Sequence, residues 1–261
     1  MEERCIGELA RELYQAELTL SPVDALTERF PEISNEEAYL VQKTGMDLRI
    51  AAGHRIVGKK IGLTSKAMQN ALGVFEPDYG YITDQMVALE GEPLSIGQFI
   101  APKVEAEIAF ILKSDLVGPG ITASRVIQAT AGVMPAFEII DTRIKNWKIK
   151  IQDTIADGAS IGKVVLAGRM TPIDACDLRT IGLVLEKNGE IVATAAGAAV
   201  LGNPVNAVAW LANKLSSYGL ELKAGDIIMS GSLTAASIAA EGDYFQASFA
   251  GIGAIGVKFN R

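Results

Sequence analysis

The chain has 261 residues, of which 49% are apolar and 21% are charged, so it can bury the core of one large domain. The net charge of −7 and the lack of a basic stripe exclude a nucleic-acid-binding surface. Two cysteines, Cys5 and Cys176, are too few for a disulfide framework and predict a reducing, cytoplasmic compartment. No signal peptide or membrane span is predicted, because glycine and proline interrupt the longest uncharged run, residues 191–213.

Two helices are predicted before residue 53. Apolar residues recur at helical spacing between positions 5 and 17, which predicts an amphipathic helix. Ser34 and Glu37 have the spacing of a capping box and predict the start of a second helix that runs to about Ala52. His54 is the single histidine, and we interpret it as a solvent-facing residue at the end of this helix, where a cation suits the helix dipole.

Residues 55–62 predict a β-strand that contains two adjacent lysines. Lys59 and Lys60 point to opposite faces, so one of them points inward if the strand is buried. A buried lysine is costly unless it is paired, which would make it a functional candidate, whereas an edge strand would leave both lysines in solvent. A short helix is predicted over residues 65–73, followed by a turn in which Asp78 comes directly after a proline.

Residues 103–112 predict a strand with two carboxylates on one face. Glu105 and Glu107 are two positions apart, so their side chains point to the same side. Alone, this pattern is typical of a solvated face of a sheet. Glu138 lies in a second strand-like run, residues 133–140, and three carboxylates from neighbouring strands would form one open site. Oxygen ligands suit a hard divalent cation such as Mg²⁺ or Mn²⁺.

The second half of the chain is predicted to be rich in β-strands. Asn188-Gly189 predicts a hairpin between two strands, and Asn203 followed by proline predicts the start of a helix that runs to about Tyr218. Residues 156–163 are rich in small residues and would let the backbone approach an anion, or form an ordinary loop. The other predicted elements are a helix at 122–131 and strands at 164–167, 226–230, 244–249 and 254–259.

Several motifs, in this order along the chain, resemble the hydratase and decarboxylase branch of the fumarylacetoacetate hydrolase superfamily. Within that branch, the chain is most similar to the 2-hydroxypenta-2,4-dienoate (2-oxopent-4-enoate) hydratases. The motifs that carry the resemblance are Gly58–Thr64, Gly73–Gly80, Val104–Ala109, Phe137-Glu138, Asp141–Trp147, Asp153–Asp157 and Leu201–Asn206. The match extends over nearly the whole chain.

The resemblance implies an α+β fold, a mixed β-roll or barrel with an N-terminal helical region. Residues 1–75 would form the helical or mixed region and residues 76–261 the β-roll catalytic domain, together in one compact unit. It also implies that Mg²⁺ or Mn²⁺ is bound by the carboxylates predicted above and that the chain forms a homo-oligomer. Its expected catalytic and substrate-binding residues are Lys60, Asp78, Leu72 and Ser160.

The activity implied is a lyase reaction, the addition of water to 2-hydroxypenta-2,4-dienoate to give 4-hydroxy-2-oxopentanoate in aromatic meta-cleavage catabolism. In this reaction Lys60, if it is buried near the cation, should have a lowered pKa and could relay a proton, and Asp78 could orient or activate water. Hydrolases of the superfamily use a histidine near the metal, and the context of His54 does not match theirs.

Two alternatives remain open: the sister 4-oxalocrotonate decarboxylase, and a non-catalytic scaffold subunit in a hydratase–decarboxylase complex. Residues 233–240 are more similar to the decarboxylase, whereas the Asp78 turn and residues 147–153 are more similar to the hydratase. Residues 157–160 have glycine where the family often has asparagine, which removes one amide from the expected substrate-binding loop.

Overall fold

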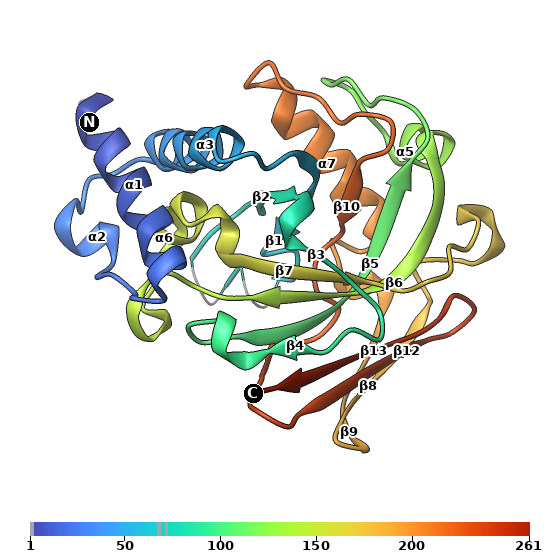
Figure 1. Ribbon diagram of the computed structural model, residues 1–261. Helices are drawn as coiled ribbons and strands as arrows, with labels where there is room; N and C mark the ends of the chain where they lie inside the picture. The colour runs from blue at the N-terminus through green and yellow to red at the C-terminus, as the bar shows by residue number, and fades with distance from the viewer. Residues whose placement is uncertain (1–2, 67–68, 71–72) are drawn as a thin grey trace.

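The computed structural model describes residues 3–66, 69–70 and 73–261, and it shows helices packed around a curled β-sheet and a second, smaller sheet (Figure 1). This arrangement confirms the predicted α+β class with an N-terminal helical region. No helix in the described ranges is long and apolar enough to cross a membrane. The helices are α1 (Glu3–Thr19), α2 (Leu26–Arg29), α3 (Asn35–Ala51), α5 (Ala123–Ala129), α6 (Ile151–Ala156) and α7 (Pro204–Ser216).

The larger sheet has eight strands in the order β2-β1-β10-β5-β6-β7-β3, with β11 also paired to β5. Its two longest strands, β5 and β6, form an antiparallel pair at its centre and are largely buried. The strands are β1 (Ile56–Gly62), β2 (Asp78–Thr83), β3 (Val87–Leu89), β5 (Lys103–Leu112), β6 (Thr130–Ile140), β7 (Ile161–Leu166), β10 (Ile227–Met229) and β11 (Ser237–Ile238).

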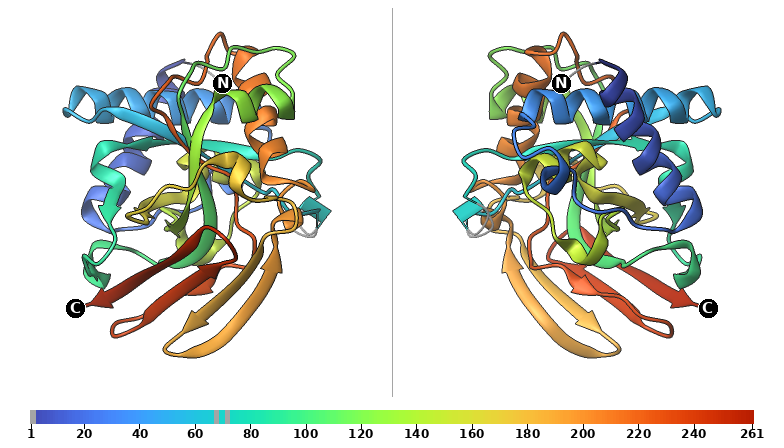
Figure 2. Two further views of the ribbon diagram at one scale, coloured as in Figure 1. Left: turned by 90° about the vertical axis from the view of Figure 1, so that its right-hand side faces the viewer. Right: turned by 90° about the vertical axis from the view of Figure 1, so that its left-hand side faces the viewer.

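The smaller sheet has five strands in the order β4-β13-β12-β8-β9 and lies below the larger sheet in Figure 1. The predicted hairpin joins β8 to β9, and its turn residues Asn188 and Gly189 have φ values of 56° and 84°, as a type I′ turn requires. Figure 2 shows this hairpin extending away from the body of the molecule. The strands are β4 (Leu94–Ser95), β8 (Gly182–Lys187), β9 (Glu190–Ala196), β12 (Tyr244–Phe249) and β13 (Gly253–Asn260).

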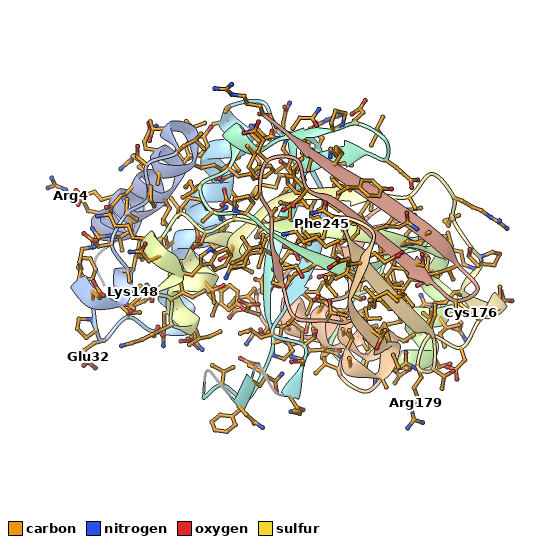
Figure 3. The ribbon with its side chains drawn as sticks, turned by 90° about the horizontal axis from the view of Figure 1, so that it is seen from below. Arg4, Glu32, Lys148, Cys176, Arg179 and Phe245 are labelled. Atoms are coloured by element: carbon orange, nitrogen blue, oxygen red, sulfur yellow. The ribbon has the colours of Figure 1, made fainter. Side chains whose placement is uncertain are left out.

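Apolar side chains of both sheets form a shared core. Phe110 and Phe137 from β5 and β6 are fully buried, as is Phe245 from β12. Figure 3 shows Phe245 in the interior, while Arg4 and Arg179 point outward at the periphery. Burial of these large apolar side chains stabilises the core.

The N-terminal helices pack against the outer part of the larger sheet. The capping box of α3 is present as predicted, since Ser34 and Glu37 satisfy each other's backbone N–H groups. Gln42 of α3 donates hydrogen bonds to the carbonyls of Tyr79 and Ile155, at 2.9 and 2.7 Å. One helix residue therefore ties α3 to both β2 and α6, a six-residue helix that the sequence pattern did not predict.

The structure tests two predictions about the strand that contains Lys59 and Lys60 and the turn that was predicted to follow at Asp78. β1 pairs with β2 on one side and β10 on the other, so it is an interior strand and both Lys59 and Lys60 are buried. The edge-strand alternative is therefore wrong. The predicted turn is also wrong at Asp78, which is the first residue of β2 and pairs with Gly62. The helix predicted over 65–73 includes positions that lie outside the described residues.

Candidate active site

The three predicted metal-binding carboxylates lie together. Glu105 and Glu107 project from the same face of β5, and Glu105 is directly opposite Glu138 in the antiparallel ladder with β6. One carboxylate oxygen from each of the three residues lies within 4.8 Å of the other two. Glu107 and Glu138 are fully buried and Glu105 is half-buried, so the solvated-face interpretation is wrong.

This cluster is electrostatically costly as a group of free carboxylates. Burial raises the pKa of Glu105 to about 7, with a further contribution from repulsion by Glu138. Burial and the two neighbouring glutamates likewise raise the pKa of Glu107 well above its usual range. The backbone N–H of Gly231 donates a 2.8 Å hydrogen bond to Glu107 Oε2, but Oε1 of Glu107 accepts none within the described ranges. Buried oxygens without donors and of like charge suit a bound cation.

Lys60 extends from β1 to the edge of this cluster. Its Nζ lies 3.1 Å from Glu138 Oε1 and donates a 2.7 Å hydrogen bond to the carbonyl of Ala159. Burial acts to lower the pKa of Lys60, but the surrounding carboxylates, Glu138 foremost, outweigh it and raise that pKa. A lowered pKa was expected for Lys60 beside a bound cation and stays a prediction, whereas the carboxylates by themselves favour the ammonium form.

Asp78 faces Lys60 from the neighbouring strand and is buried. Thr154 of α6 donates a 3.4 Å hydrogen bond to Asp78 Oδ2, while Oδ1 accepts no hydrogen bond from a side chain or backbone group of the described chain. Burial raises the pKa of Asp78, and the nearby Lys60 ammonium partly opposes this effect. One oxygen of the carboxyl group is thus fixed by a hydrogen bond, and the other can interact with a ligand or water.

A cavity of about 350 Å³ opens above these groups and is lined by Lys60, Asp78, Glu105 and Ser160. The hydroxyl of Ser160 donates a 3.4 Å hydrogen bond to Asp157, and Gly158 before it has a φ of 68°. The expected substrate contact Leu72 lies outside the described residues. Thr234, Ala235 and Ala236, from the stretch that resembles the decarboxylase, also line the cavity.

Three further cavity residues were missed by the sequence interpretation: Lys103, Trp147 and Thr154. Lys103 could have been found, because it shares its face of β5 with Glu105 and Glu107. Trp147 and Thr154 belong to irregular or short helical segments whose direction the pattern does not indicate. His54 is outside this cavity, where its Nδ1 lies 3.2 Å from Thr83 Oγ1, and it is half-buried rather than fully solvent-facing.

Comparison with known proteins agrees with this geometry. Residues 57–260 match the family model described as fumarylacetoacetate (FAA) hydrolase C-terminal. The chain belongs to the fumarylacetoacetate hydrolase family. Within this family it is 52% identical over 221 residues to a 2-hydroxypent-2,4-dienoate hydratase of Pseudomonas putida, a match that covers 84% of this chain and all of the relative.

Members with decarboxylase activity are also similar to the chain. A 4-oxalocrotonate decarboxylase of Pseudomonas putida is 40% identical, over 96% of this chain and 95% of the relative. The solved structure of 4-oxalocrotonate decarboxylase from Pseudomonas putida G7, complexed with magnesium and adipate, superposes with a TM-score of 0.97 at 39% identity. That match covers 99% of this chain and 98% of the solved one. The two activities therefore share one fold and sequence family.

Proposed function

We propose that the chain is a metal-dependent lyase that adds water to 2-hydroxypenta-2,4-dienoate and gives 4-hydroxy-2-oxopentanoate. The observation that carries this proposal is that the cluster of three carboxylates lies beside Lys60 and reaches, through Glu105, the cavity that Lys60 and Asp78 also line. A scaffold subunit would have no need for so costly a cluster. The hydratase relative at 52% identity supports hydration. Decarboxylation is the second candidate, because a decarboxylase relative is 40% identical.

The donor set fits a divalent metal ion, and the finer choice is Mg²⁺ or Mn²⁺. Glu105, Glu107 and Glu138 would hold it, because they offer only oxygen ligands and several of their oxygens lack hydrogen-bond donors. When bound, such an ion supplies Lewis-acid stabilisation of negative charge on the carboxylate and C2 oxygen of the substrate. The decarboxylase solved with magnesium is a relative in which the same class of ion occurs.

The residues of the chain would supply the proton transfers. Lys60, protonated and fixed by Glu138 and the Ala159 carbonyl, is placed to deliver a proton to C5 of the dienol. Asp78, fixed by Thr154, has a free oxygen that can accept a proton from the water that adds at C4 and return that proton to C3, which completes the hydration. The C2 hydroxyl loses its proton as the keto form is produced, and this proton returns Lys60 to its ammonium form. Ser160 and Leu72 are proposed substrate contacts.

A product assay tests this function. The protein is supplied with 2-hydroxypenta-2,4-dienoate or with 2-oxohex-3-enedioate, in Mg²⁺ or Mn²⁺, and each reaction is repeated with chelator. Metal-dependent formation of 4-hydroxy-2-oxopentanoate from the dienoate supports the hydratase. Release of carbon dioxide from the dioate, with the dienoate unchanged, would establish the decarboxylase instead.

A pair of lysine variants tests the role of Lys60. Lys60→Met should lower kcat by about 100-fold or more, the usual contribution of a general acid. Lys59→Met is the matched control, since Lys59 is buried in the same strand but lies on the opposite face, 3.8 Å from Asp226. Full activity in a folded Lys60→Met variant would remove this lysine from the mechanism.

The assembly and location of the chain are proposals from the family resemblance alone. We propose a cytoplasmic homo-oligomer that can associate with a sister decarboxylase or hydratase. Light scattering of the purified chain, alone and mixed with a sister enzyme, measures both associations. A monomer that stays separate from the sister enzyme would contradict them.

A further inference from the structure

Lys103 is a cation in the cavity that has no counter-ion. The two buried lysines of β1 each have a carboxylate partner, Asp226 for Lys59 and Glu138 for Lys60. Among the described residues, none places a carboxylate within ion-pair distance of Lys103. Its Nζ lies instead 3.9 Å from the ring centroid of Trp147, in a cation–π contact. The cavity wall therefore presents a positive charge that an anionic ligand can pair with.

The fold holds Trp147 in a defined position beneath this ammonium group. The indole Nε1–H donates a 3.1 Å hydrogen bond to the carbonyl of Ala101. Asn146 and Trp147 both have positive φ values, 59° and 56°, which cost free energy for residues with side chains. The neighbouring structure thus maintains an unfavourable backbone conformation that places the indole against Lys103.

Lys103 and the reacting groups lie on different sides of Glu105. Lys103 precedes Glu105 by two positions on one strand face, a separation of roughly 7 Å along the strand. Lys60 pairs with Met229 of β10, which pairs with Ala109 of β5, so Lys60 is level with a position beyond Glu105 in the opposite direction from Lys103. A substrate whose C4 and C5 atoms face Lys60 and Asp78 would therefore direct its carboxylate end toward Lys103.

We propose that Lys103, held against Trp147, binds the C1 carboxylate of the 2-oxo or 2-hydroxy acid and so positions the reacting carbons. This inference rests on the proposed function, which supplies a substrate with that carboxylate. A carboxylate has two oxygens, so contact with Lys103 leaves the other oxygen for a metal ion. A charge-assisted hydrogen bond from an ammonium group is short and comparatively strong, which suits a positioning role.

The test measures ligand binding without turnover. Trp147 and Trp210 are the two tryptophans of the chain, so in a Trp210→Phe background the fluorescence reports Trp147 in the cavity wall. Pyruvate and the neutral analogue pyruvamide are titrated in the presence of Mn²⁺, by fluorescence and by calorimetry. The variants are Lys103→Met, Lys103→Arg and the control Lys113→Met, which removes an exposed lysine just beyond the other end of β5.

We expect Lys103→Met to weaken pyruvate binding by about 10- to 100-fold, the usual effect of losing a hydrogen bond to a charged group. Pyruvamide binding should change little, so the preference for pyruvate should disappear. Lys103→Arg should restore part of it, and Lys113→Met should leave both affinities unchanged. In steady-state assays the same Lys103→Met variant should raise KM more than it lowers kcat.

The alternative outcomes are distinct. An unchanged preference for pyruvate in Lys103→Met would overturn the inference. Weaker binding of adipate, with pyruvate binding intact, would show that Lys103 recognises a distal carboxylate, which also contradicts the C1 assignment. If the wild-type protein with Mn²⁺ binds no 2-oxo acid, the proposed function fails as well. If the preference collapses as expected but the dienoate is not hydrated, the inference stands and the proposed reaction is wrong.

Discussion

Gly62 and Asp78 are paired across β1 and β2 so closely that a side chain at position 62 has no room. A Cβ atom on Gly62 would lie 2.1 Å from Oδ1 of Asp78. That oxygen is the one without a hydrogen bond from the described chain, and Lys60 Nζ lies 3.5 Å from the same Cβ position. Glycine at this position therefore provides the space in which the Asp78 carboxyl group is held, rather than a special backbone conformation.

The first prediction concerns this pair. Gly62→Ala should displace the Asp78 carboxyl group and lower kcat by about 100-fold, because displacements near 1 Å have effects of that size on positioned groups. Gly182→Ala is the control, since a Cβ there meets no atom within 4 Å. The double variant Gly62→Ala/Asp78→Asn should be hardly slower than Asp78→Asn alone, because both changes remove the same function. Additive losses in kcat would contradict this account.

The second prediction separates metal binding from the stability of the metal-free protein. Glu107→Gln removes one negative charge from a buried cluster while keeping an acceptor for the Gly231 N–H, so the metal-free protein should melt a few degrees higher, at about 2–4 °C per kcal/mol for a chain of this size. Glu138→Gln leaves the Lys60 ammonium without its partner, so the melting temperature should fall.

Calorimetric titration with Mn²⁺ should show weakened binding in both variants, by at least about tenfold, and the stabilisation that Mn²⁺ gives the wild-type protein should be lost. Glu190→Gln, at an exposed position in β9, is the control for charge alone. Wild-type Mn²⁺ affinity in either site variant would show that the ion does not bind at this cluster.

The sequence predicted that the three carboxylates would lie together, because strand alternation places Glu105 and Glu107 on one face and Glu138 lies in an adjacent strand-like run. The same rule could not decide between Lys59 and Lys60, since it says only that they point to opposite sides. The choice depends on which face of β1 lies on the same side of the sheet as the glutamates, a long-range relationship because β10 separates β1 from β5. Asp78 was misplaced for a related reason: proline and aspartate indicate a turn locally, but pairing with Gly62 extends the strand.

The third prediction concerns Asp153, the residue that anchors the unpredicted helix α6. Its buried carboxylate accepts hydrogen bonds from the N–H and hydroxyl of Thr27, at 3.0 and 2.7 Å, and from Lys150 N–H at 2.9 Å. Thr27→Val removes one of these donors and should lower the free energy of unfolding by about 1–3 kcal/mol. Because α6 also presents Thr154 to Asp78, Asp153→Ala should lower both stability and kcat.

Urea unfolding and steady-state kinetics measure these two effects. Thr19→Val provides a comparison in which an exposed hydroxyl, bonded only to the Gln15 carbonyl, is removed. This change should alter the free energy of unfolding by less than about 0.5 kcal/mol. Equal destabilisation by Thr19→Val and Thr27→Val would show that the buried contact with Asp153 contributes no more to the free energy of unfolding than an exposed hydrogen bond does.

The last prediction extends from the cavity to Arg143 behind it. The buried guanidinium pairs with Asp157, at 2.5 Å from Nε to Oδ1, and donates hydrogen bonds to the carbonyls of Asp141, Asp157 and Ile161. These contacts fix the short helical turn η4 (Gly158–Ser160), whose middle carbonyl accepts the hydrogen bond from Lys60. Arg143 thus acts on the site through the backbone that it holds.

Arg143→Lys keeps the charge but loses the planar, multidentate donor set, so the turn should loosen. We expect kcat to fall by about tenfold or more and the free energy of unfolding to fall by about 2–4 kcal/mol, since a buried pair and several carbonyls lose donors. Arg179→Lys, at an exposed position, should change neither quantity. If Arg143→Lys destabilises the fold but leaves kcat and KM at wild-type values, the turn does not depend on this arginine for its position at Lys60.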